Sequence, residues 1–84
     1  MNELYLKKYT ENEIVYEYLP EGKGDKGIVA YSFDKKSASI QKVATSDSNQ
    51  YYAWMATSAV AQIANENNIP RVSTQAWYWF HKTK

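Results

Sequence analysis

Hydrophobic and polar residues alternate with a period of two over residues 13–20. Ile14, Tyr16 and Tyr18 therefore share one face of an extended segment, as expected for a half-buried β-strand. The same alternation returns over residues 27–34 after a glycine-rich stretch, which is the pattern of two strands joined as a β-hairpin. The main sheet is therefore predicted to contain this hairpin.

Two weaker patterns flank the hairpin. Residues 38–43 predict a third strand, so that the three strands form an antiparallel meander. Residues 4–10 are ambiguous, because Leu4 and Leu6 fit one face of a strand but the polar residues around them also fit a loosely held segment. We therefore expect residues 1–12 to form either an edge strand or an arm.

The period changes to that of a helix after residue 47. Asp47 followed by Gln50 fits a capping box, in which side-chain oxygens accept the free N–H groups of the first turn. The helix is predicted over residues 48–67, because the residue before Pro70 disfavours helical torsion angles. The positions expected to face the sheet recur at helical spacing: Tyr52, Met55, Ala56, Ala59 and Ile63, with Val60 at their edge.

A last strand is predicted over residues 73–80, which gives the element order β-β-β-α-β. That order indicates an α+β fold with two layers, in which one long helix covers one face of an antiparallel sheet of three or four strands. At 84 residues, we expect 1–84 to be a single domain, and the large enzyme scaffolds cannot fit.

The predicted helix carries no charged residue from Ser48 to Asn65. A helix on the surface of a two-layer protein normally places Lys and Glu on its outer side. Here the outer positions are Tyr51, Trp54, Ser58, Ala61 and Asn65. The last strand is apolar on both sides, with Trp77 and Trp79 on one of them. Something besides the sheet is therefore expected to shelter these positions.

Two interpretations fit these uncharged aromatic positions. They can belong to the core, where aromatic residues of small domains are usually found. They can also form a protein–protein surface, because interface centres are poor in charge and rich in Trp and Tyr. Under the second interpretation we expect a homodimer or a protein partner, with Tyr51, Trp54 and Ala61 or Trp77 and Trp79 buried between subunits.

Composition narrows the class of protein. With 44% hydrophobic and 23% charged residues the chain is globular rather than disordered. A net charge of +1 gives no general attraction to nucleic acid or acidic lipid, and the absence of cysteine excludes disulfides and thiolate metal sites. No apolar signal segment or membrane span is visible, so a soluble, cytoplasmic protein is expected.

A literal G-x-G-x-x-G motif occupies residues 22–27. A dinucleotide-binding fold needs a helix after the third glycine, whereas a strand is predicted here. Turn geometry with positive φ accounts for the glycines. Binding of an anion by Lys23, Lys26 and the loop amides stays open.

Single-stranded nucleic acid is the alternative partner, because bases stack on aromatic sheet faces. Such a face would comprise Tyr16, Tyr18, Tyr31 and Phe33, with lysines 23, 26, 35 and 36 around it. The same aromatic residues are the natural core of the sheet, and neighbouring carboxylates cancel most of the positive field. The sequence therefore favours a protein partner over nucleic acid.

Catalysis finds little support in the residue types present. His81 is the single histidine, and no cysteine exists to form a nucleophile–base pair with it. A polar residue that closes an apolar strand is the simplest interpretation of His81. We expect a non-enzymatic protein with no catalytic, metal or cofactor site.

The hairpin and the end of the chain carry a resemblance. The segment Tyr16-Glu17-Tyr18-Leu19-Pro20-Glu21-Gly22, with Gly27-Ile28-Val29-Ala30-Tyr31 and the closing Ala76-Trp77-Tyr78, resembles short uncharacterised bacterial proteins, some of the kind carried by mobile elements. These proteins share a hairpin, a helix and an Ala-Trp-Tyr-like end. The resemblance implies a fold of this type and transfers no activity.

Overall fold

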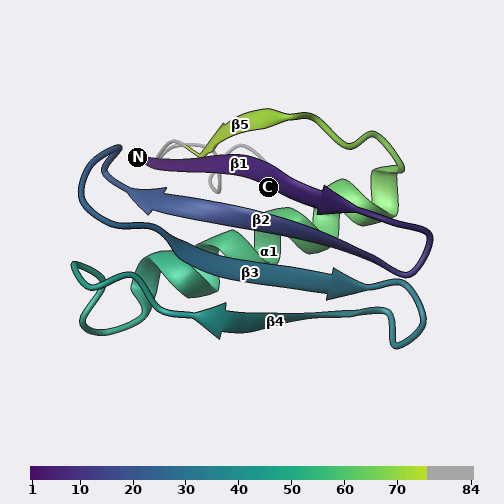
Figure 1. Cartoon of the computed structure of the whole chain (residues 1–84), viewed down its shortest axis with the longest axis horizontal. Helices are drawn as coiled ribbons and strands as arrows, with labels where there is room; N and C mark the ends of the chain where they lie inside the picture. The colour runs from purple at the N-terminus through teal and green to yellow at the C-terminus, as the bar shows by residue number, and fades with distance from the viewer. Residues whose placement is uncertain (76–84) are drawn as a thin grey trace, which may run out of the picture.

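The computed structural model describes residues 1–75, which form one sheet and one helix (Figure 1). The strands are β1 (Asn2–Tyr9), β2 (Glu13–Pro20), β3 (Gly27–Ser32), β4 (Ser37–Lys42) and β5 (Val72–Gln75), and helix α1 spans Tyr51–Glu66. Within these residues the fold is α+β with a five-stranded antiparallel sheet in the order β4-β3-β2-β1-β5. The expected fold class is confirmed, and the expected three or four strands are too few.

The fifth strand is the first segment of the chain. β1 lies between β2 and β5, so it is an inner strand and neither an edge strand nor an arm. A register shift between Leu6 and Lys8 interrupts its pairing with β2. Because such a bulge inserts an extra residue, it breaks the alternation by which the strand would have been recognised.

The helix carries the chain from one edge of the sheet to the other. Strands β1 to β4 follow one another as a meander, α1 crosses one face, and β5 then pairs with β1 at the far edge (Figure 1). The last strand was expected over residues 73–80. Its described part ends at Gln75, and Trp77, Trp79 and His81 lie outside the described residues.

Large side chains of the sheet and small side chains of the helix make the core. Tyr16 and Tyr18 are fully buried on the face that α1 covers. The helix presents Ala53, Ala56 and Ala59 to them, and these methyl groups let the helix axis approach a sheet filled with tyrosine. The expected sheet-facing positions Met55, Ala56, Ala59 and Val60 are buried, while Tyr52 and Ile63 are half-buried against the core.

The helix begins at a buried carboxylate. Asp47, which is 1% exposed, accepts hydrogen bonds from the backbone N–H groups of Tyr52 at 3.0 Å and Ala53 at 2.8 Å. The Tyr18 hydroxyl donates to the same carboxylate at 3.0 Å. The expected capping role of Asp47 is confirmed, but the capping box is wrong: Gln50 has a φ of 62° and makes no side-chain cap. The helix therefore starts at Tyr51 rather than at residue 48.

The other face of the sheet is wetted by ion pairs. Glu17 lies 3.7 Å from both Lys7 and Lys26, and the Lys26 ammonium lies 5.0 Å from the centre of the Tyr5 ring. Charged and aromatic groups from β1, β2 and the hairpin loop thus lie on this face beside half-buried apolar residues of β2 and β3.

Two of the three glycines adopt the positive φ values of the turn, and the third leaves space for a side chain of the core. Gly22 and Gly24 have φ values of 74° and 89°, as the turn interpretation of residues 22–27 predicts. Gly27 pairs with Tyr18 across the hairpin, and a Cβ there would lie 2.1 Å from the Tyr18 ring. The third glycine therefore makes room for the tyrosine that binds Asp47.

Asp47→Ala should lower the free energy of unfolding by about 2–4 kcal/mol. It removes three hydrogen bonds and leaves two N–H groups of the first helical turn, one of them buried, without an acceptor. Urea unfolding followed by far-UV circular dichroism measures the loss. Asp34→Ala, in the exposed turn before β4, is the matched control and should change stability by less than about 0.5 kcal/mol. Equal stability of the two variants would contradict the capping role.

Candidate functional site

The outer side of α1 is uncharged and exposes a large aromatic side chain. Trp54 is 61% exposed and Tyr51 is 44% exposed in the first turn, and Ser58 and Asn65 follow on the same side. We call these four residues the helix flank. Ala61, which was expected with them, is half-buried and packs against the core. The structure thus brings Tyr51 and Trp54 together and sets Ala61 apart.

A hollow of about 310 Å³ adjoins the helix flank at the start of α1. Its walls come from the first turn of the helix, the start of β1 and the loop after β2: Met1, Glu21, Tyr51, Tyr52 and Met55. We call it the Glu21 pocket. The Tyr51 and Tyr52 rings meet edge to face, with centres 5.4 Å apart and planes at 77°. The volume of the Glu21 pocket lies at the lower limit of ordinary ligand pockets.

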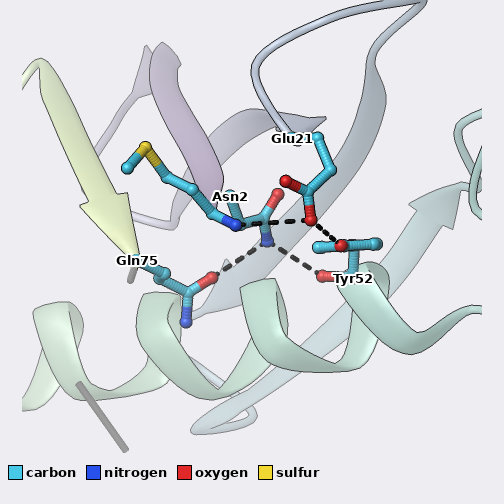
Figure 2. Close-up of polar contacts among 5 residues, drawn as sticks. Asn2, Glu21, Tyr52 and Gln75 are labelled. Carbon is cyan, nitrogen blue, oxygen red and sulfur yellow. Dashed lines mark hydrogen bonds and ion pairs between the residues drawn. The ribbon is translucent and has the colours of Figure 1, made fainter. Parts of the chain in front are cut away.

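Glu21 and Tyr52 give the pocket its polar character. The Tyr52 hydroxyl donates a hydrogen bond to Glu21 Oε2, and the amino group of Met1 lies 3.4 Å from the same oxygen (Figure 2). The hydrogen bond from Tyr52, and then the positive charge of the Met1 amino group, lower the pKa of Glu21. The same bond raises the pKa of Tyr52 to about 12.

These shifts move the pKa values of Glu21 and Tyr52 further from neutral pH. A general acid or base works best when its pKa lies near the working pH. At neutral pH Glu21 is a fixed acceptor and Tyr52 a fixed donor. The arrangement is suited to holding a hydrogen-bonding group in place rather than to moving a proton.

Two buried amide side chains connect the sheet to the helix beside the pocket (Figure 2). Asn2 Nδ2 donates to the carbonyl oxygen of Tyr52 at 3.1 Å and to Gln75 Oε1 at 3.0 Å. Gln75 Nε2 donates in turn to the carbonyl oxygen of Met55 at 2.9 Å. Because each amide nitrogen faces a carbonyl oxygen, the orientation of both side chains is determined. The first turn of α1 is thus held by β1 and β5.

Sequence reasoning missed these residues. Asn2 and Gln75 are separated by 73 positions and carry no spacing signal. Tyr52 and Met55 were placed on the sheet-facing side of the helix, and Glu21 was named only within the hairpin segment that carries the resemblance. No local pattern reveals that the loop after β2 returns to the start of α1.

The aromatic platform proposed for nucleic acid lies inside the protein. Tyr16, Tyr18 and Tyr31 are buried under α1, and Phe33 packs against the same core. These rings are therefore not offered to bases. In the glycine-rich loop, the Asp25 carboxylate accepts hydrogen bonds from the backbone N–H and hydroxyl of Thr45, which ties the loop to the segment before α1.

Residues 1–75 contain neither a candidate metal centre nor a helix that could span a membrane. No group of three or more His, Asp or Glu side chains there is placed to hold a metal ion. The helix of this part of the chain is not long and apolar enough to cross a membrane. Comparison with protein-family models, with curated proteins and with solved structures finds no match to the chain.

Asn2→Ala should lower the free energy of unfolding by about 1–3 kcal/mol, because it leaves Gln75 Oε1 buried without its donor. Urea unfolding measures the change. Asn12→Ala, in the exposed turn between β1 and β2, is the control and should stay within about 0.5 kcal/mol of the parent. Two variants of equal stability would show that the amide pair does not hold the helix.

The protein should lose stability between pH 10 and pH 12. Burial raises the pKa of Tyr16 and of Tyr18 to about 12, and the bond to Glu21 does the same for Tyr52. An unfolded tyrosine titrates near pH 10. A pKa that is higher in the folded state adds stability that is complete below about pH 10 and disappears as pH rises through 12.

Urea midpoints measured across this range test the prediction. The midpoint should fall with rising pH, and it should fall less steeply in Tyr52→Phe than in Tyr9→Phe, which changes an exposed ring. A midpoint that stays constant up to pH 12 would contradict the assignment of buried, protonated tyrosines.

Proposed function

We propose that this protein is a non-enzymatic interaction protein that associates with other protein chains, in the first place with itself, through the helix flank. The observation that carries the proposal is Trp54, which is 61% exposed on a helix side without a charge. Trp is the residue type most enriched among the side chains that dominate interface energies. The proposal assigns Trp54 to the centre of the contact.

The surroundings of Trp54 support an interface rather than a solvated surface. Ser48, Asn49 and Gln50 before it and Ser58 after it are exposed and uncharged. Charge depletion at the centre with polar residues around it is the usual anatomy of an interface. The opposite face of the sheet, in contrast, carries the ion pairs of Glu17 with Lys7 and Lys26.

Self-association is favoured by the symmetry of the contact. A two-fold dimer brings the same patch of both copies together, so like charges in the patch would repel each other. An uncharged flank avoids that cost, and the net charge of +1 gives only weak repulsion between copies. Trp77 and Trp79, the other pair expected at an interface, lie outside the described residues, so the proposal rests on Trp54.

Trp54→Ser should weaken the dimer at least about 30-fold, since loss of a central Trp costs about 2 kcal/mol or more. The free energy of unfolding of the monomer should change by less than about 0.5 kcal/mol, because the side chain is exposed. Sedimentation equilibrium from micromolar to millimolar concentration measures the first quantity, and urea unfolding the second.

Tyr9→Ser is the matched control, because Tyr9 is 57% exposed at the end of β1 far from the start of α1 (Figure 1). It should dimerise as the parent does. A parent chain that stays monomeric throughout this range contradicts self-association. Equal weakening by both substitutions would mean that exposed aromatic side chains associate non-specifically, and not through the helix flank.

A further inference from the structure

We propose that the dimer forms by mutual insertion: the Trp54 indole of each copy enters the Glu21 pocket of the other and donates its N–H to Glu21. The inference rests on the self-association proposed above and specifies its geometry. It assigns the Glu21 pocket an occupant, a second copy of this chain, and gives Glu21 a role in addition to its contacts with Tyr52 and Met1 within one chain.

The walls of the pocket suit an indole. Tyr51 and Tyr52 present an edge-to-face pair with ring planes at 77°, the relation in which a third aromatic ring also packs favourably. Met55 supplies a thioether, which packs well against aromatic rings. At about 310 Å³ the hollow is large enough for one bicyclic side chain.

The polar side of the pocket matches the one polar atom of the indole. A buried Trp N–H needs an acceptor, and an ionised carboxylate is a strong one. The bonds from Tyr52 and from the Met1 amino group both go to Glu21 Oε2, so Oε1 can accept the indole N–H. The depressed pKa of Glu21 keeps that acceptor ionised at neutral pH.

The positions of the indole and the pocket satisfy the symmetry of a dimer. In a two-fold contact, residue i of one copy meets residue j of the other while j meets i. Trp54 lies on the same helical turn as the pocket residue Tyr51, and both side chains are exposed, so the indole and the pocket adjoin each other at the start of α1. Two copies can therefore exchange indoles across a single axis.

The indoles alone do not make an interface of ordinary size. Two inserted indoles contribute at most about 300–500 Å², twice the area of one aromatic side chain, and Trp54 is already partly buried in one chain. A standard interface buries about 1,200–2,000 Å², so the proposed contact also includes the uncharged polar residues around Trp54.

A labelling experiment separates insertion from general contact of the flanks. The variant Trp54→Ala lacks the indole but keeps the pocket, and it is labelled with ¹⁵N. Unlabelled parent chain, which carries the indole, is then added, and in a parallel sample unlabelled Trp54→Ala is added instead. We expect the amide resonances of Glu21, Tyr52 and Met55 to shift with the parent chain and to stay in place with the variant.

Each outcome has a defined meaning. Shifts at the pocket that need the Trp54 of the added chain support insertion. Absence of these shifts, or shifts confined to β4 or β5, overturns insertion; if the parent still dimerises and Trp54→Ser does not, the proposed function stands without it. A parent chain that is monomeric at all concentrations overturns both.

A second substitution tests the acceptor. Glu21→Gln keeps the shape of the side chain and replaces a charged acceptor by a neutral one in both copies. Each of the two hydrogen bonds of the dimer should lose about 1 kcal/mol, so the dimer should weaken about 30-fold. Glu11→Gln, an exposed position in the turn after β1, is the control and should leave the dimer unchanged. A parent-like dimer in Glu21→Gln would overturn the assignment of Glu21.

Discussion

The carboxylate of Asp47 fixes where and how the helix lies on the sheet. It is buried, and it accepts two N–H groups of the first turn of α1 together with the hydroxyl of Tyr18 from β2. The same hydroxyl accepts the N–H of Ala44, so that the segment before the helix is bound as well. A buried carboxylate is tolerated only when its hydrogen-bonding capacity is used, and here the donors come from helix α1 and from strand β2. The rotation of the helix about its axis is therefore set at its first turn.

That rotation determines which side chains of the first turn meet water. With Ala53 and Ala56 turned toward the buried tyrosines, Trp54 must point away from the sheet. Asn2 and Gln75 reinforce the arrangement by binding the carbonyl oxygens of Tyr52 and Met55. The exposure of Trp54 is thus a consequence of polar contacts on the opposite side of the same turn.

The sequence predicted the elements in which buried residues recur at a regular spacing. Alternation over β2 and β3 and the helical period of α1 located these elements, because burial of one face imposes a pattern on neighbouring residues. β1 was predicted as an edge strand or an arm, since its bulge after Leu6 breaks that pattern. The amide pair of Asn2 and Gln75 and the return of Glu21 to the helix could not be predicted. Each of these contacts joins two residues that are far apart in the sequence. Such a single contact leaves no regular spacing of residue types by which it could be predicted.

The uncharged residues of the helix lie in two different surroundings in the structure. Two explanations were open, burial in the core and burial in an interface, and each would remove the need for charge. The core takes Ala53, Ala56, Ala59 and Val60 and leaves Trp54 outside. The aromatic core formed by Tyr16 and its neighbours already gives the described part of the chain a filled interior. At 61% exposure the indole contributes little to the packing of one chain. The proposed self-association would give this side chain an apolar partner, and the adjoining pocket, with its aromatic walls and ionised carboxylate, is the surface that we propose for that contact.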